Sequence, residues 1–121
     1  MSLKPIRLLA DGHPETGFVP SDLVQKQDFT TADTTEIISS FYQNEDESVL
    51  VGVWECAPCR EEFEAYPVDE MMTVISGSVT LTGSDGIAQT FTAGDTFFMA
   101  KGTPGIWEIT ETLRKFYMIA G

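Results

Sequence analysis

The sequence predicts an all-β domain, a sandwich or barrel built from about ten short antiparallel strands. Two observations predict this fold. From residue 37 onward, apolar and β-branched residues occur in short runs, and most runs end at a turn that contains glycine, such as Ser76-Gly77 or Asp85-Gly86. These turns follow one another so closely that no helix fits between them.

The strands are expected one after another from residue 37 to residue 120. The segment 48–56 is apolar on both faces, so we expect it inside the sandwich or against a partner subunit. Residues 60–66 alternate charged and apolar side chains, which favours a strand with one face in water. The expected strands are 37–42, 48–56, 60–66, 71–76, 78–81, 88–92, 96–100, 106–110 and 112–120.

The chain before these strands is expected to form an N-terminal arm and loops. Glycines and prolines interrupt any periodicity in residues 1–20, where one short strand is expected near Leu8 or Phe18. Residues 21–27 have the composition of one capped helical turn. The prediction is therefore a single domain, 1–121, with the arm and loops over 1–36 and a β-barrel core over 37–121.

The charge of the chain narrows the classes of partner. Seven Lys and Arg residues against nineteen Asp and Glu residues give a formal net charge of −12. Such a surface repels phosphate backbones and anionic lipids, so nucleic acid and membrane partners are not expected. No targeting segment is visible, and a cytoplasmic protein is expected. A sandwich of this size must protect its strand edges and surplus apolar faces, which favours a homodimer.

Two short motifs stand out in the central part of the chain. In the first, Glu70 is followed after six residues by Gly77. The second begins at Gly94 and includes Gly102. These motifs resemble those of the cupin superfamily, also called RmlC-like, although Gly105 stands where the family has a His. The resemblance implies a double-stranded β-helix, the cupin jelly-roll barrel.

A closer resemblance is to the cupins related to ureidoglycine aminohydrolase and to the ethanolamine-utilisation cupin. It extends over residues 48–118 and involves six segments in the same order along the chain. These segments are Gly52-Val53-Trp54-Glu55, Tyr66-Pro67-Val68-Asp69-Glu70, Asp85-Gly86, Gly94-Asp95-Thr96-Phe97, Trp107-Glu108 and Arg114-Lys115-Phe116-Tyr117.

The metal ligands that the resemblance implies are mostly absent. The His positions of the first motif hold Glu64 and Tyr66, or Phe63 and Ala65 with the alternative spacing. The only histidine, His13, lies in the N-terminal arm. A three-histidine site is therefore excluded within one chain. A divalent metal bound only by Glu64, Tyr66 and Glu70 is the disfavoured alternative, and no cofactor is expected.

The resemblance places Glu70 inside the barrel, where a carboxylate must be paired or protonated. Lys115 is the expected partner. Two interpretations stay open: a catalytic pair, with Glu70 as general base and Lys115 anchoring a ligand, or an ion pair that only braces the barrel. The expected ligand-binding residues are Trp54, Glu64, Tyr66, Trp107 and Tyr117, although the two tryptophans also suit a plain core.

The two cysteines, Cys56 and Cys59, have the spacing of a redox or zinc motif. A redox motif requires the first Cys at a helix N-terminus, and a zinc site requires further ligands. Both lie at a turn between expected strands, so two free thiols are expected.

Three functions remain open from the sequence. The first is binding of a small polar metabolite in the barrel, without a histidine-bound metal. The second is an enzyme that hydrolyses or isomerises a ureide-like or sugar-like substrate. The third is a non-catalytic dimerisation module whose barrel is filled by side chains.

Overall fold

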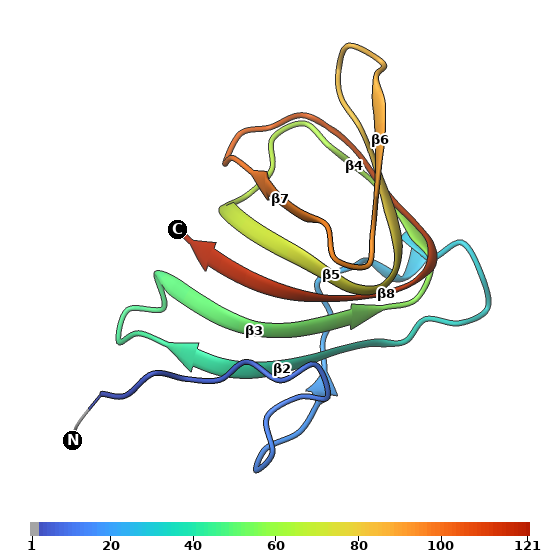
Figure 1. Cartoon of the computed structure of the whole chain (residues 1–121). Helices are drawn as coiled ribbons and strands as arrows, with labels where there is room; N and C mark the ends of the chain where they lie inside the picture. The colour runs from blue at the N-terminus through green and yellow to red at the C-terminus, as the bar shows by residue number, and fades with distance from the viewer. Residues whose placement is uncertain (1–2) are drawn as a thin grey trace.

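The computed structural model describes residues 3–121, and these residues form one antiparallel sheet of eight strands that curls on itself (Figure 1). This confirms the all-β prediction. The strands are β1 (Val19–Pro20), β2 (Glu36–Gln43), β3 (Val49–Cys56), β4 (Cys59–Phe63), β5 (Asp69–Thr82), β6 (Ala88–Thr92), β7 (Thr96–Met99) and β8 (Gly105–Ala120).

Two of the observed strands are longer than the sequence predicts. The expected strands 71–76 and 78–81 are one strand, β5, and the expected strands 106–110 and 112–120 are one strand, β8. In β5 the reason is that Gly77 does not end its strand. With φ at 80°, it lies inside β5 at a point where the pairing register with β8 shifts. The residue predicted to be in a turn is therefore in a bulge.

The bulge divides both long strands into halves that pair with different neighbours. The first half of β5 pairs with β7 and with the second half of β8. That half of β8 also pairs with β3, which is followed in the sheet by β2 and β1. The second half of β5 pairs with β6 and with the first half of β8, which also pairs with β4. The core lies between these two parts of the curled sheet. This arrangement is a jelly roll.

The core is formed largely by inward-facing residues of β3, β5 and β8. The face of β3 that contains Trp54 and Cys56 belongs to this core. The opposite face of β3 is partly covered by the N-terminal arm: Arg114, beside β3, donates a hydrogen bond to the carbonyl of Ala10 and lies over the ring of Phe18. Within the chain, only the second half of the segment 48–56 is buried on both faces, because Val53 is buried and Val51 is partly exposed.

A buried carboxylate, Glu36 at the start of β2, fixes the segment that follows the arm. It accepts hydrogen bonds from the hydroxyl of Ser21, from the backbone N–H groups of Leu23 and Val24, and from the indole of Trp54. These four donors compensate the burial of the charge. As a result, residues 21–24 lie across the open end of the curled sheet.

The helical turn expected within 21–27 is a single 3₁₀ turn, η1 (Lys26–Asp28). No helix in the described part of the chain is long and apolar enough to cross a membrane.

Candidate functional site

A cavity of about 480 Å³ opens at the end of the curled sheet, between the inward faces of β2, β3, β4, β5 and β8 and the segment 21–24. Its walls are mostly apolar, with a few polar side chains among them. Such a cavity is the usual form of a small-molecule site. It is lined by Ser21, Leu23, Val24, Ile38, Leu50, Trp54, Glu61, Phe63, Tyr66, Pro67, Val68, Glu70, Trp107, Lys115, Tyr117 and Ile119.

A buried ion pair forms part of the cavity wall. The Lys115 ammonium lies 2.8 Å from Oε2 of Glu70, and the Tyr66 hydroxyl donates to Oε1 of Glu70 at 2.7 Å. The two charged side chains are each 6% exposed. Both oxygens of Glu70 thus have a donor, and the charge of Glu70 is compensated within the protein.

Two aromatic rings enclose the same ammonium. Lys115 Nζ lies 4.8 Å from the ring centres of both Trp54 and Trp107, and 2.9 Å from the sulfur of Met72. These rings attract the cation through their π faces. The two tryptophans, whose ring centres are 6.4 Å apart, therefore both stabilise the charge of Lys115.

The phenol groups at the cavity differ in their hydrogen bonding. Tyr66 is bound to Glu70, whereas the Tyr117 hydroxyl has no hydrogen-bond partner within residues 3–121. Burial, together with the charge of Glu70, raises the pKa of Tyr117 to about 12 and raises that of Tyr66 further. Tyr117 therefore remains a neutral hydroxyl that can donate a hydrogen bond to a ligand.

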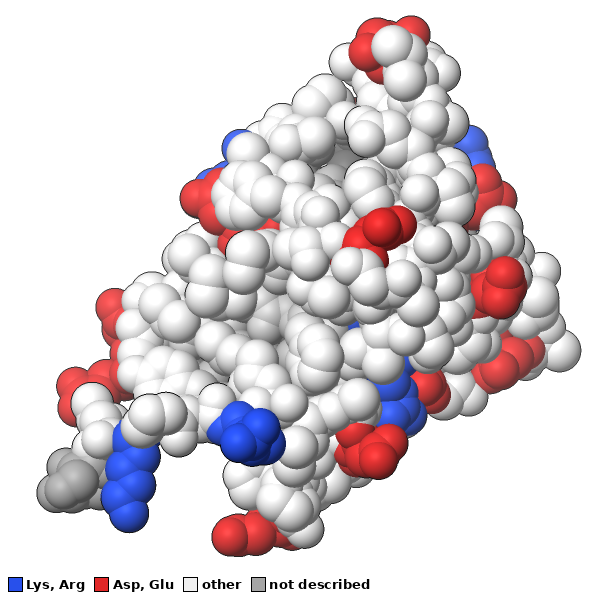
Figure 2. All heavy atoms as spheres, in the orientation of Figure 1, with Lys and Arg blue, Asp and Glu red and all other residues white. Residues whose placement is uncertain are grey.

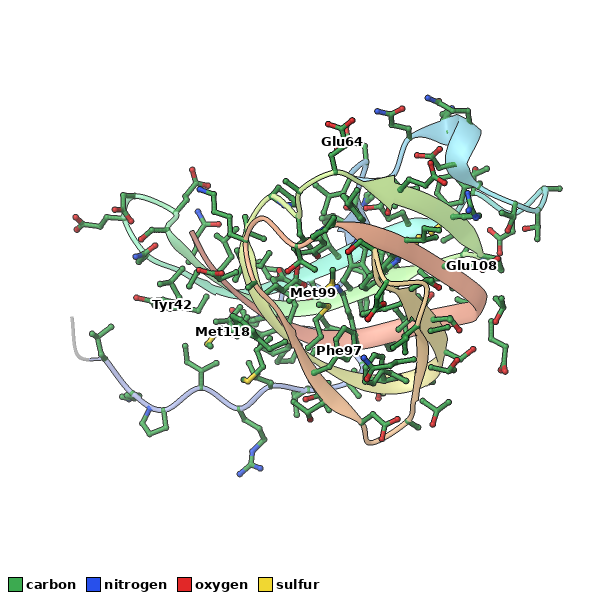
Figure 3. All side chains as sticks on the ribbon, turned by 90° about the horizontal axis from the view of Figure 1, so that it is seen from above. Tyr42, Glu64, Phe97, Met99, Glu108 and Met118 are labelled. Carbon is green, nitrogen blue, oxygen red and sulfur yellow. The ribbon has the colours of Figure 1, made fainter. Side chains whose placement is uncertain are left out.

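The structure brings together all of the predicted site residues except one. Trp54, Tyr66, Glu70, Trp107, Lys115 and Tyr117 line the cavity. Glu64 does not, because β4 ends at Phe63 and the side chain of Glu64 is exposed and points away from the barrel (Figure 3). Glu64, which the sequence places among the ligand-binding residues, therefore lies outside this cavity.

The carboxylate that the sequence analysis missed is Glu61, in the middle of β4. It lines the cavity and makes no hydrogen bond or ion pair with the residues that the structure describes. Burial, with smaller contributions from Asp28 and Glu36, raises its pKa to about 7, against a lowering by Lys115. The strand pattern could have indicated this residue: Glu61 shares its face of the strand with Cys59, which is in the core, and with Phe63, which packs against the core.

We expect Glu61→Gln to change how stability depends on pH. Since the folded pKa of Glu61 is about 7 and its ordinary value is 4.5, folding favours the protonated form. The contribution of Glu61 to the free energy of unfolding is fully present below about pH 4.5 and is lost as the pH rises through about 7. The variant should therefore be more stable than the wild type by about 2 kcal/mol near pH 8 and by little near pH 5.

Denaturant unfolding at a series of pH values measures this difference. Glu64→Gln serves as the control, because Glu64 is exposed and its replacement should leave the pH profile unchanged. Parallel profiles for the wild type and Glu61→Gln would contradict the assignment.

Cys56 and Cys59 are free thiols, and both are completely buried. The pKa of the Cys56 thiol lies well above its ordinary value, first because of its hydrogen bond with Cys59 and then because of burial. Protonated, buried thiols are poor nucleophiles and poor metal ligands. Both cysteines therefore act as core residues.

The donor set that a cupin metal site requires does not fit this cavity. Tyr66 and Glu70 are hydrogen-bonded to each other, Lys115 places a positive charge on Glu70, and Glu64 lies outside. Among residues 3–121, no three His, Cys, Asp or Glu side chains are grouped so that they could hold a metal ion.

Comparison with protein families decides where this fold belongs. Residues 43–117 match the model of the EutQ-like cupin domain, which is more than half of the 121-residue chain. The chain belongs to the EutQ-like cupin family. Among curated proteins, no sequence is similar to this cupin.

Solved structures agree with this assignment. A protein of unknown function from Pseudomonas syringae, of the DUF861 family, is 25% identical with a TM-score of 0.79; the alignment covers 93% of this cupin and 46% of that protein. A protein of unknown function from Rhizobium leguminosarum is 19% identical with a TM-score of 0.63 over 99% of this chain and 98% of that one. The ethanolamine utilization protein EutQ from Salmonella typhimurium is 18% identical with a TM-score of 0.59, over 71% and 69% of the two chains.

These likenesses establish the cupin fold, and the chain spans less than half of the Pseudomonas protein.

Proposed function

We propose that this cupin binds a small polar metabolite in the cavity, and that the metabolite presents N–H groups to Glu61 and a carbonyl oxygen to Tyr117. Amides, ureides and related compounds have this combination of groups. The observation that carries the proposal is Glu61: a carboxyl group in an apolar cavity, without a hydrogen-bond partner in the described part of the chain. An unpaired carboxylate in such a place is costly, and a ligand that donates to it removes that cost.

The other polar groups of the cavity support this choice of ligand. Glu70 and Lys115 compensate each other and have little capacity left for a charged ligand. The Tyr117 hydroxyl and the Trp107 indole N–H remain as donors, and Glu61 remains as an acceptor above its pKa of about 7. Apolar walls at Ile38, Leu50 and Ile119 suit a compact, uncharged body. A volume of about 480 Å³ is within the usual range for ligand cavities.

Titration calorimetry with small amides, ureides, guanidines and sugar acids tests the proposal. We expect the probes with N–H donors to bind, and to bind more tightly as the pH rises through about 7, because Glu61 then accepts as a carboxylate. Glu61→Gln should weaken this binding about tenfold or more and remove its pH dependence.

Glu64→Gln is the matched control, since it removes the same charge from an exposed position outside the cavity. Equal binding by the wild type and Glu61→Gln would overturn the proposal. A preference for sugar acids over all N–H donors would also overturn it.

A second candidate is an enzyme that hydrolyses or isomerises a ureide-like or sugar-like substrate. The pKa of Glu61, about 7, favours it, because a general base is most effective when its pKa is close to the working pH. Glu70 is less suited to this role, since both of its oxygens accept hydrogen bonds. Conversion of a bound probe, followed by NMR, separates this candidate from simple binding.

A further inference from the structure

Lys115 differs from the other three lysines of the chain, because its side chain is buried while theirs are exposed. It lines the apolar cavity, beside a carboxylate and between two indole rings. Lysines that form Schiff bases with carbonyl compounds are commonly removed from water in a pocket of this kind. The surroundings of Lys115 therefore raise the question of whether its nitrogen reacts.

Lys115, Glu70 and Tyr66 form a chain of two hydrogen bonds. The ammonium of Lys115 donates to Oε2 of Glu70 at 2.8 Å, and Oε1 of the same carboxylate accepts from the Tyr66 hydroxyl at 2.7 Å. A nucleophile within hydrogen-bond reach of a proton acceptor, which a third group holds in place, is the general arrangement of an activated nucleophile. Glu70 can therefore accept a proton from Lys115 along a hydrogen bond that is already present.

The ammonium of Lys115 has one N–H group without a partner in the described part of the chain. An ammonium has three donors. One donates to Glu70 and one to the sulfur of Met72, at 2.9 Å, and the third has no acceptor within residues 3–121. Tyr117, whose hydroxyl is also free there, follows two residues later on the same face of β8 and lines the same cavity. A neutral ligand in the cavity is therefore beside the side chain of Lys115.

The product of a reaction with a carbonyl group suits the same surroundings. Condensation of an ammonium with an aldehyde or ketone gives a protonated imine, which has the same single positive charge. The rings of Trp54 and Trp107, each centred 4.8 Å from Nζ, attract this charge as they attract the ammonium. Glu70 remains its counter-ion. The reaction therefore leaves no buried charge unpaired.

We propose that Lys115 forms a Schiff base with an aldehyde or ketone that also has an amide or ureide group. Lys115 first passes one proton to Oε2 of Glu70, and the resulting amine attacks the carbonyl carbon. A C–N bond forms, and the carbonyl oxygen takes a second proton from the nitrogen and becomes a hydroxyl group. Glu70 then returns its proton to this hydroxyl, which leaves as water while the C=N bond forms. No oxidant or reductant is required.

The choice of an amide or ureide group rests on the proposed function, in which Glu61 and Tyr117 bind that group. The Schiff base itself depends only on Lys115 and Glu70. Its chemistry is compatible with the ion pair of these residues, because an aldehyde or ketone is neutral and makes no demand on either charge.

Reductive trapping on the wild-type protein tests the proposal. The probe is 2-oxopropanamide, a ketone with one amide group, and sodium cyanoborohydride converts an imine into a stable secondary amine. Mass spectrometry should show one adduct per chain, and peptide mapping should place it on Lys115. The exposed Lys4, Lys26 and Lys101 are internal controls in the same digest. They should react at least about tenfold more slowly, because no pocket holds the probe beside them.

The surface offers few competing amines. Figure 2 shows that Lys and Arg side chains are few and scattered on the face of the molecule in that view. Labelling of the exposed lysines with none on Lys115 would contradict the Schiff base. Because the wild type is used, this result does not depend on whether a variant folds.

Two variants locate the reacting nitrogen. Lys115→Arg keeps a positive charge beside Glu70 but cannot form an imine, so the adduct should be lost. Lys101→Arg is the matched control, since Lys101 is exposed, and it should be labelled as the wild type is. An adduct that persists in Lys115→Arg at the wild-type rate would show that another amine reacts.

The two proposals for the cavity fail separately. Small amides that bind while 2-oxopropanamide leaves Lys115 unlabelled would overturn the Schiff base and support the ligand class. Butanone has no amide group, so we expect it to label Lys115 more slowly than 2-oxopropanamide. Equal labelling of Lys115 by the two ketones, in the wild type and in Glu61→Gln, would support the Schiff base and overturn the amide or ureide group.

Discussion

Lys115→Met is expected to lower the free energy of unfolding by about 3–5 kcal/mol. In the folded protein the ammonium of Lys115 is 2.8 Å from a carboxylate oxygen of Glu70, and both side chains are 6% exposed. The variant keeps most of the side-chain volume but removes the charge, which leaves Glu70 buried with only the hydroxyl of Tyr66 as a donor. Stranding a buried charge is among the most destabilising single changes.

Denaturant unfolding measures the loss, and a double-mutant cycle identifies its cause. The double variant Glu70→Gln/Lys115→Met removes both charges together, so it should lose less stability than the two single variants combined. Arg60→Met is the control: its ion pair with Glu62 is exposed, and its removal should change stability by less than about 0.5 kcal/mol. Additive losses in the cycle would show that the pair is not coupled.

The expected loss of stability limits which variants can be used to test ligand binding in the cavity. Glu70 and Lys115 were the two predicted catalytic residues, yet replacing either one is expected to weaken the fold. A loss of ligand binding in those variants would therefore not distinguish a binding role from a structural one. Glu61 does not have this problem, because it makes no hydrogen bond or ion pair within residues 3–121 and its replacement by Gln should stabilise the protein above about pH 7.

The sequence predicted the inward residues of the long strands better than those of the short ones. Trp54, Trp107 and Tyr117 lie on strands with a long alternating pattern, and the resemblance to cupins supplied the inward direction of Glu70. In β4 the pattern is only five residues long. The family motif drew attention to Glu64, which follows the strand, instead of Glu61, which is in it.

Glu36 shows a different limit of sequence reasoning. The residue was expected in a loop, but it starts β2 and accepts four hydrogen bonds in the core. Three of these donors come from residues 21–24, which are distant in the sequence, and nothing in the local pattern indicates that they meet Glu36. A buried carboxylate whose partners are backbone N–H groups has no sequence signature.

Gly77→Ala is expected to cause a loss of about 4 kcal/mol, comparable to that of Lys115→Met. Gly77 has φ at 80°, where an alanine is strained, and an added Cβ would lie 2.0 Å from the carbonyl oxygen of Thr112. That oxygen belongs to the backbone of β8, opposite the bulge, so relief of the clash requires the two long strands to separate. Since both halves of the curled sheet depend on β5 and β8, the strain cannot stay local.

Gly86→Ala separates the clash from the strain in φ. Gly86 has φ at 81°, nearly the same as Gly77, but no heavy atom lies within 4 Å of an added Cβ. Its replacement by Ala should therefore lower the free energy of unfolding only through the strained backbone φ, by about 1–2 kcal/mol. Thermal and denaturant unfolding of the two variants measure the difference directly. Equal losses would mean that β8 adjusts to the added Cβ without a further loss of stability. The close approach of the Thr112 carbonyl oxygen to Gly77 would then not be what fixes the bend by which β5 and β8 enclose the cavity.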